Sequence, residues 1–400
     1  MKPLSYVVKS APPSGIRKFF DIVSQMSDVI SFGVGEPDFV TPWRIREACI
    51  YSLEQGYTNY TSNYGLLELR QAISKHLWER WGLEYNPENQ ILITVGVSEA
   101  LDLAMRTLVN PGDEVLIPMP CYVSYAPCVS FAGGTPVAIP TTAENGFRVS
   151  AAQIKAAVTS KTKALIMSYP TNPTGAVIGR AELQEVIDVA RSCDLYVVSD
   201  EIYDRLTYEG VHTCTAALEG AYERTILLNG FSKAYAMTGW RIGYAAAPAE
   251  IIECMMKVHQ YTMLCAPIMS QMAALEALKN GEADCEEMVE EYNRRRKLIV
   301  SGLNDIGLEC GMPGGAFYAF PSIRSTGLTS EEFAERLLFE EKVAVVPGNA
   351  FGECGEGHIR CSYATSVEQI REGLDRIAKF VERVRVNSGQ TEALREIEAS

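Results

Sequence analysis

The sequence predicts an α/β fold with a mostly parallel sheet in a large domain, accompanied by a smaller α+β domain. From about Gln90, short apolar segments alternate with longer amphipathic ones, an order typical of a parallel sheet flanked by helices. After about Asn280 the order changes to a long polar helix, short strands and a final helix. We therefore expect a large domain at 40–282 and a small domain built from 1–39 and 283–400.

The individual elements follow from the same patterns. Expected strands of the large domain lie at 91–94, 114–118, 135–139, 164–168, 195–199, 225–228 and 242–246, with amphipathic helices such as 98–108 and 180–192 between them. The small domain should contain helices at 283–303 and 366–386 and strands at 316–320, 343–346 and 358–362. The Pro- and Gly-rich N-terminal stretch to Phe39 should wrap onto this domain. The polar segment 387–400 is expected to be a loose tail.

Composition excludes several classes of protein. The chain has 400 residues, 47% of them hydrophobic and 22% charged, as in ordinary globular proteins. A net charge of −14 argues against a nucleic-acid partner. Apolar runs have strand length, which excludes a membrane span, and the N-terminus lacks a signal-peptide core, so a cytoplasmic protein is predicted. Eleven cysteines without a Cys-x-x-Cys pair predict reduced thiols and no metal site.

Polar residues cluster where predicted strands end. Asp200 and Glu201 follow an apolar strand, and a buried acid is costly unless it is paired; taken alone, such an acid is better explained as a cap of the next turn. Lys233 follows the strand at 225–228, although most loop lysines are merely exposed. Arg241 lies between two glycines before a strand, where its fork suits a phosphate or a surface ion pair.

Two strand-to-helix connections complete the set. Residues 168–175 contain two prolines and a glycine around Asn172, which predicts a rigid turn and, alone, no more than that. Residues 94–100 join a strand to a helix whose first N–H groups form a natural phosphate cradle. A plain helix cap by Ser98 explains this last segment equally well.

The joint order of these segments is specific. A phosphate cradle, an Asn-Pro turn, Asp-x-x-Tyr, Ser-Lys and Arg-x-Gly follow one another at strand ends. In this respect the chain resembles the class I/II aminotransferases, which are pyridoxal 5′-phosphate (PLP) enzymes of fold type I. The similarity extends from about Ser14 to the final helix.

The resemblance implies PLP as cofactor and gives roles to residues around its ring. Lys233 is implied as the lysine joined covalently to PLP, which later moves a proton at the substrate Cα. Asp200 is implied to face the pyridine nitrogen and keep it protonated. Tyr203 and Asn172 match residues that hydrogen-bond the ring oxygen, and Tyr122 matches an aromatic residue that stacks on the ring.

The same resemblance implies a phosphate site and a shared active site. Val97 and Ser98, through helix N–H groups, together with Ser232 and Arg241, match the residues that hold the phosphate. Tyr60 matches a tyrosine that reaches the phosphate of the neighbouring subunit. A homodimer with shared active sites is therefore expected.

Substrate residues and departures from the family pattern are also implied. Arg360 matches the arginine that binds the substrate α-carboxylate, and Gly35 matches the glycine whose backbone lies along the substrate. Segment 12–39 is then expected to close over the substrate as a lid. Many relatives carry Ser or Thr where this chain has Gly230, so either the expected cradle is weaker or Ser232 covers the loss. Some aspartate-specific relatives carry a lysine at the position of Ser98, and its absence weakens a strict aspartate preference.

The segments 14–19 and 257–261 are similar to those of a subgroup that acts on aspartate, aromatic amino acids or N-acetyl-LL-2,6-diaminopimelate, with 2-oxoglutarate as the expected amino acceptor. One alternative is a PLP-dependent β-lyase or synthase on the same fold. A more remote one is a transcription regulator with an aminotransferase-like sensor domain. The acidic charge and the start of the chain close to the 14–39 segment disfavour the regulator.

Overall fold

The computed structural model describes residues 2–11 and 26–399, with backbone only from 387 onward. The motif at 14–19 and the first part of the expected lid therefore lie outside the described residues. A short helix, α1 (Tyr6–Ser10), lies before that gap. None of the described helices is both long enough and apolar enough to cross a membrane.

Within the described residues, the largest sheet has seven strands in the order β2-β8-β7-β6-β5-β3-β4. Strand β8 is antiparallel to β2 and β7, and the remaining neighbours are parallel, which confirms the predicted mostly parallel α/β fold. The strands are β2 (Ile91–Thr94), β3 (Glu114–Met119), β4 (Thr135–Pro140), β5 (Thr162–Met167), β6 (Tyr196–Asp200), β7 (Thr225–Gly230) and β8 (Gly243–Ala246).

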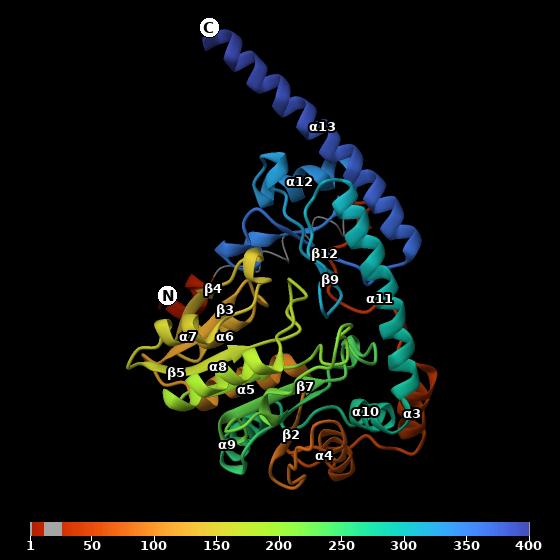
Figure 1. Cartoon of the computed structure of the whole chain (residues 1–400). Coiled ribbons are helices and arrows are strands. Elements are labelled where there is room, and N and C mark those ends of the chain that lie inside the picture. The colour runs from red at the N-terminus through yellow and green to blue at the C-terminus, as the bar shows by residue number, and fades with distance from the viewer. Residues whose placement is uncertain (1, 12–25, 400) are drawn as a thin grey trace.

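Helices cover both faces of this sheet because its strands are apolar on both sides (Figure 1). Successive side chains of a strand point to opposite faces. Val115 and Ile117 pack with one group of helices, whereas Leu116 packs with the other. The first group is α5 (Gly96–Leu108), α6 (Tyr125–Phe131) and α9 (Ala249–Thr262), and the second is α7 (Ala151–Ala157) and α8 (Arg180–Ser192).

Three further helices pack beside strand β2. They are α3 (Trp43–Glu54), α4 (Leu67–Trp81) and α10 (Ile268–Asn280). Ile45, Leu77 and Ala273, one from each helix, share a buried cluster with Ile93 of the strand. This layer holds the edge of the sheet from which helix α5 begins.

The C-terminal part contains α11 (Glu282–Asp305), α12 (Ser330–Glu341) and two small sheets. One sheet is antiparallel, in the order β11 (Val346–Pro347), β12 (Ile359–Ser362), β9 (Tyr318–Ala319), and the other pairs β1 (Ile30–Ser31) with β10 (Val343–Ala344). The single strand predicted at 343–346 is wrong, because the chain there changes partner from β1 to β12.

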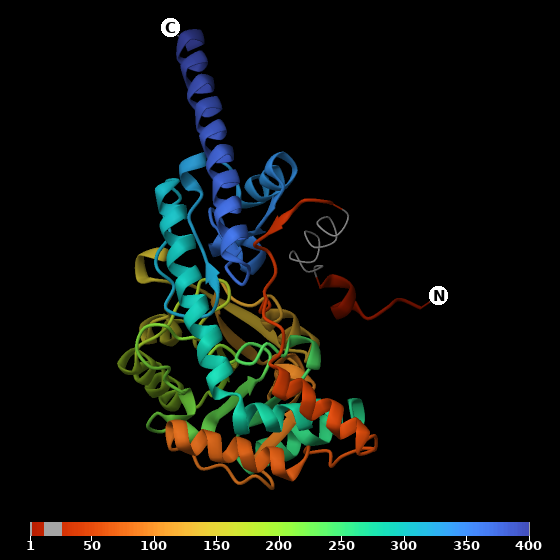
Figure 2. The same cartoon turned by 90° about the vertical axis from the view of Figure 1, so that its right-hand side faces the viewer.

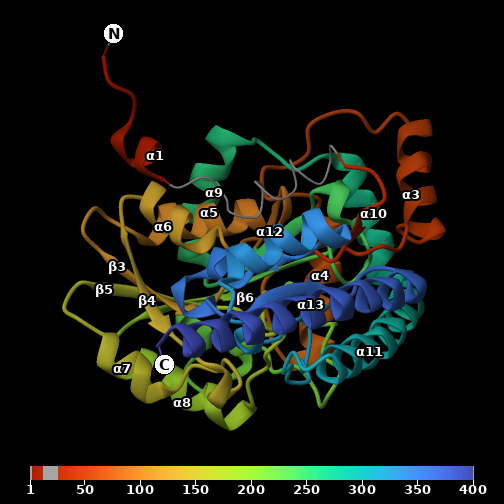
Figure 3. The same ribbon diagram turned by 90° about the horizontal axis from the view of Figure 1, so that it is seen from above.

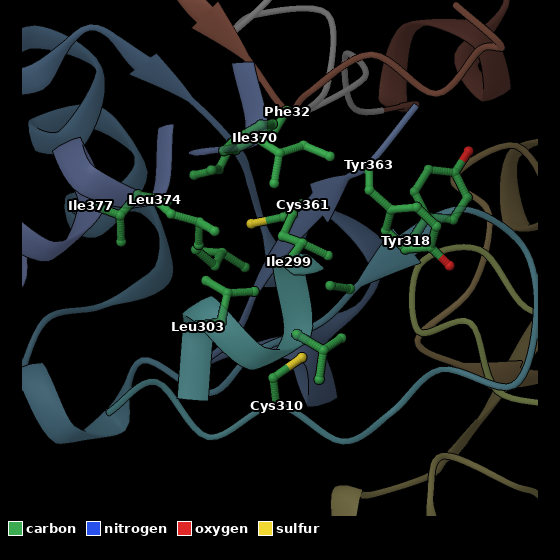
Figure 4. Packing of buried hydrophobic residues seen from close by; sticks show 14 of the residues in the cluster. Phe32, Ile299, Leu303, Cys310, Tyr318, Cys361, Tyr363, Ile370, Leu374 and Ile377 are labelled. Atoms are coloured by element: carbon green, nitrogen blue, oxygen red, sulfur yellow. The ribbon is translucent and has the colours of Figure 1, made fainter. Parts of the chain in front are cut away.

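The N-terminal segment 26–39 lies against this C-terminal part (Figure 2). Phe32 is buried in one cluster with Ile299 of α11 and with Ile370 and Leu374 of the last helix (Figure 4). Seen from above, α11, α12 and the last helix lie beside one another (Figure 3). Apolar contacts therefore join residues that are more than three hundred positions apart.

The last helix, α13 (Val367–Ala399), continues well beyond the predicted end at 386 and runs away from the rest of the chain (Figures 1 and 2). The expectation of a loose tail at 387–400 is therefore wrong for the described backbone. The segment is polar, but Glu, Ala, Leu and Arg at 392–396 are strong helix formers. Polarity alone therefore said little about backbone conformation.

Candidate active site

A cavity of about 600 Å³ lies at the carboxyl ends of β6 and β7, beside the start of α5. This is where open α/β sheets bind ligands. The predicted residues that line it are Gly35, Val97, Ser98, Tyr122, Asn172, Asp200, Tyr203, Ser232, Lys233, Arg241 and Arg360. Tyr60 does not line it, and its side chain is 81% exposed.

Lys233 follows β7 and donates a hydrogen bond from Nζ to the carbonyl of Gly35 at 2.7 Å. Burial lowers the pKa of this lysine to about 8, and the nearby Glu36 carboxylate only partly opposes that effect. A substantial fraction of the amine is consequently neutral near neutral pH. A neutral amine is the form that attacks an aldehyde.

Asp200 is the last residue of β6 and is buried. Its Oδ2 accepts a hydrogen bond from Tyr125 Oη at 2.8 Å, and its Oδ1 accepts one from the Ile202 backbone N–H at 3.2 Å. Burial raises the pKa of Asp200 to about 6, although both hydrogen bonds favour the carboxylate. The group therefore holds a negative charge at neutral pH in a place where a cationic partner would be stabilised.

The start of α5 forms an anion site. No side chain caps this helix, whose first residue Gly96 has φ +74°, so its first N–H groups are available to a ligand. A Cβ at Gly96 would lie 2.7 Å from Arg241 Nη2, so only glycine lets the guanidinium come this close. Arg241 Nη1 also donates to the Thr238 carbonyl at 3.1 Å. Ser98, the alternative helix cap, does not cap it.

Arg360 comes from β12 and is buried on the opposite side of the cavity. Its Nη1 donates to Asn172 Oδ1 at 2.9 Å and its Nη2 to the Gly33 carbonyl at 2.5 Å. Its Nε is buried without a hydrogen-bond partner, and no carboxylate of the described residues pairs with it. A buried cation in this state calls for an anion from outside the chain.

Sequence reasoning missed several side chains that line the cavity, and two of them, Tyr125 and Tyr318, contact predicted site residues. Tyr125, the partner of Asp200, is the first residue of α6 and lies three residues beyond the predicted Tyr122, and the two rings contact edge to face with centroids 5.6 Å apart. Tyr318 lines the cavity below the Arg360 guanidinium, which lies 4.5 Å from its ring centroid. No sequence signal pointed to Tyr125 or to Tyr318.

The donor set fits PLP. An amine with a lowered pKa suits the aldehyde, a buried carboxylate suits the ring nitrogen, and uncapped N–H groups beside an arginine suit the phosphate. A second arginine remains for an anionic substrate. The fold and the site together define a PLP-dependent enzyme of fold type I.

Comparison with known proteins specifies the family. Residues 27–377 match the model of aminotransferase class I and II, and the chain belongs to this PLP-dependent family. It is 58% identical to a putative aminotransferase of Bacillus subtilis, over 94% of this chain and 98% of the relative. It is 50% identical to the aspartate aminotransferase of Pyrococcus abyssi, over 92% and 96% of the two chains.

A solved structure agrees with these sequences. The aromatic aminotransferase from Pyrococcus horikoshii superimposes with a TM-score of 0.88 at 47% identity, covering 91% of this chain and 99% of that one. The predictions of the family, the fold and the PLP cofactor are confirmed.

Proposed function

We propose that this aminotransferase moves an amino group from an amino acid of the aspartate, aromatic or N-acetyl-LL-diaminopimelate type to a 2-oxo acid, with 2-oxoglutarate as the acceptor. The observation that carries the proposal is the buried Arg360, a cation without a carboxylate partner among the described residues, in the cavity that also contains Lys233. Relatives named for aspartate and for aromatic amino acids support the donor class.

When bound, PLP supplies an aldehyde that takes up the amino group and a ring that accepts electrons. Lys233 provides the amine that attaches the cofactor and then moves a proton from and to the substrate Cα. Its lowered pKa supports this role, because the amine must be neutral to accept a proton. Asp200 holds the proton on the ring nitrogen, oriented by the hydroxyl of Tyr125.

We infer the remaining cofactor contacts from the family resemblance, and their place in the lining of the cavity supports them. The N–H groups of Val97 and Ser98, the Ser232 side chain and the Arg241 guanidinium hold the phosphate. Tyr122 stacks on the ring.

Asn172 and Tyr203 contact the ring oxygen. Asn172 keeps its amide nitrogen available, since its Oδ1 accepts from Arg360. Both residues line the cavity.

Arg360 fixes the substrate by a bidentate contact with its α-carboxylate. Gly35, whose carbonyl accepts from Lys233, lies along the substrate. A fixed carboxylate orients the Cα–H bond relative to the amine, and orientation of this kind can account for several kcal/mol of a reaction barrier, on the order of 7–11 in the best cases.

The active site is shared between two subunits in this proposal. Tyr60 is 81% exposed and lies outside the cavity of its own chain, as expected of a side chain that serves a partner. Large exposed side chains nearby, including Trp43, Tyr51 and Tyr57, support a covered face. Mixing inactive Tyr60→Ala and Lys233→Ala proteins tests whether the site is shared. In a hybrid dimer one site combines Lys233 of the first chain with Tyr60 of the second and is therefore intact. Absence of any regained activity contradicts sharing.

The division into domains 40–282 and 1–39 with 283–400 also stays a proposal. The common cluster of Phe32 with α11 and α13 supports it. The cytoplasmic location remains a prediction from the sequence.

The substrate assignment is tested with a panel of amino acids in the presence of 2-oxoglutarate. Formation of glutamate and of the matching 2-oxo acid supports the proposal, whereas pyruvate with free ammonia indicates the alternative, a β-lyase.

The Arg360→Lys variant should raise KM for every carboxylate substrate, because an ammonium cannot make the bidentate contact. In the Lys233→Ala protein the visible band of the covalently held cofactor should disappear, and an unchanged spectrum contradicts the assignment of Lys233.

A further inference from the structure

Tyr318 and Tyr203 form a buried pair of hydroxyl groups. Their oxygens lie 2.7 Å apart, both side chains are buried, and both line the cavity. Tyr203 lies in the turn after β6, three residues beyond Asp200, whereas Tyr318 belongs to β9 of the antiparallel sheet. The contact therefore connects the main sheet with the sheet that carries Arg360.

The ring of Tyr318 also contacts the substrate arginine. The Arg360 guanidinium lies 4.5 Å from the ring centroid, a cation–π distance. Residue 318 pairs with Ser362 in the register of β9 and β12, which places it next to Arg360 on the neighbouring strand. One side chain thus contacts the arginine through its ring and Tyr203 through its hydroxyl.

The glycine at position 35 leaves room for the Tyr318 hydroxyl. A Cβ at Gly35 would lie 2.8 Å from Tyr318 Oη and 3.7 Å from Arg360 Nη1. A larger residue at position 35 would push the hydroxyl away from Tyr203. The arrangement of the pair therefore depends on close packing from three separate segments.

The geometry of the pair allows either hydroxyl to donate, and the guanidinium beside the Tyr318 ring favours Tyr318 as the donor. Burial raises the pKa of Tyr318, but the positive charge of Arg360 opposes the rise. Burial raises the pKa of Tyr203 well above its ordinary value, and the neighbouring Tyr318 raises it further. Tyr318 is the more acidic member and hence the better donor, which leaves the Tyr203 proton free to point into the cavity.

We propose that Tyr318 is a positioning residue that donates a hydrogen bond to Tyr203 and thereby keeps Tyr203 as a donor to the ring oxygen of PLP. This inference rests on the proposed function, which places the cofactor in the cavity. Tyr318 itself need not contact the reacting atoms. Its effect is transmitted through the orientation and donor strength of one hydroxyl group.

The test is Tyr318→Phe in the PLP-loaded enzyme, because phenylalanine keeps the ring below Arg360 and removes only the hydroxyl. A donor to an ionised oxygen favours the ionised form. The pH midpoint of the visible cofactor band should therefore rise by about 0.5 unit, the scale expected for one weakened hydrogen bond. KM for the carboxylate substrate should change by less than about twofold, because Arg360, which binds the substrate carboxylate, is unchanged in this variant.

Two further variants separate positioning from general stability. Tyr363→Phe is the matched control: Tyr363 is a buried neighbour whose hydroxyl donates to the Ala316 carbonyl at 3.1 Å, outside the cavity lining (Figure 4). This variant should leave the midpoint unchanged. In a Tyr203→Phe background, Tyr318→Phe should add no further shift, because the coupled hydroxyl is gone.

The outcomes are distinct. If wild-type protein transaminates and the midpoint of Tyr318→Phe equals that of wild type, the positioning role is overturned while the proposed function stands. The positioning role is also overturned if Tyr318→Phe shifts the pH midpoint equally in the wild-type and the Tyr203→Phe backgrounds. If wild-type protein forms no 2-oxo acid from any amino acid, the proposed function itself fails.

Discussion

A buried ion pair behind the active site permits a quantitative prediction. Glu201 follows Asp200, is buried, and contacts His212 Nε2 through Oε2 at 2.6 Å. Its Oε1 accepts from the Thr215 backbone N–H at 2.8 Å and from Ser199 Oγ at 2.9 Å. The pair therefore supports the turn that carries Asp200 into the cavity.

The perturbation is His212→Leu, which keeps an apolar contact with Trp81, whose ring centroid lies 6.0 Å from that of His212. Removing one partner of a buried pair typically costs about 3–5 kcal/mol. Because Thr215 and Ser199 still donate to Glu201, we expect the lower end, about 3 kcal/mol of the free energy of unfolding. His212→Gln, which can still donate a hydrogen bond, should cost less.

The pH dependence has a definite sign. Burial acts to lower the pKa of His212, but Glu201 outweighs it and the net shift is upward. Stability from the protonated histidine is full below its unfolded pKa of about 6.5 and is lost as pH rises through the raised folded value. Burial acts to raise the pKa of Glu201, but His212 and the hydrogen bonds lower it. The stability that the Glu201 carboxylate contributes is present above its unfolded pKa of about 4.3 and is lost as pH falls through its lowered folded pKa.

The assay is equilibrium urea unfolding at one protein concentration, repeated at pH 6 and pH 9. The cost of His212→Leu should be larger at pH 6. Lys257→Gln is the control, since its pair with Glu253 is exposed and its loss should not change the unfolding midpoint measurably. A cost for His212→Leu below about 1 kcal/mol at pH 6, or the same cost at both pH values, would refute the reasoning.

Three further results are expected. Glu99→Met should weaken PLP binding about tenfold in a fluorescence titration, because Glu99 Oε2 accepts from the Val95 N–H at 2.5 Å and so holds the start of α5; an unchanged Kd contradicts this. Gly230→Ser should lower stability by about 1–3 kcal/mol in urea unfolding, because its Cβ would lie 2.9 Å from Gly243 Cα; a gain in stability contradicts it. Labelling of apo-protein at Lys233 by an aldehyde, trapped by reduction and followed by mass spectrometry, should rise with a midpoint near pH 8; a midpoint above 10 contradicts burial as the cause.

The strands of the main sheet were predictable because they are apolar on both faces. A continuous apolar run bounded by polar residues indicates such a strand, and Thr225–Gly230 is buried throughout. The predicted bounds differ from the observed ones by at most two residues, since pairing with neighbouring strands decides where a strand ends. Val343–Ala344 and Val346–Pro347 show the limit: one apolar run serves two sheets, and local sequence cannot reveal a change of partner.

Individual site residues were predictable where they stand directly at a strand end, as Asp200 and Lys233 do. Tyr125 and Tyr318 could not be found, because their relevance comes from contacts across 75 and 115 positions. Strand β9 is only two residues long, and Ala316 just before it has φ +55°. No alternating pattern of useful length therefore marks Tyr318 as facing the site.

Burial of the whole cavity explains why its two principal titratable groups shift in opposite directions. Desolvation penalises whichever form is charged, so it lowers the pKa of Lys233 to about 8 and raises that of Asp200 to about 6. Without ligands, burial disfavours the charged forms of the Lys233 amine and the Asp200 carboxyl. Under the proposed function, a cofactor with a cationic ring nitrogen and an anionic phosphate would supply counter-charges to Asp200 and Arg241, and a substrate carboxylate would supply one to Arg360. Charge neutralisation therefore favours binding of cofactor and substrate in the same cavity that keeps the amine reactive.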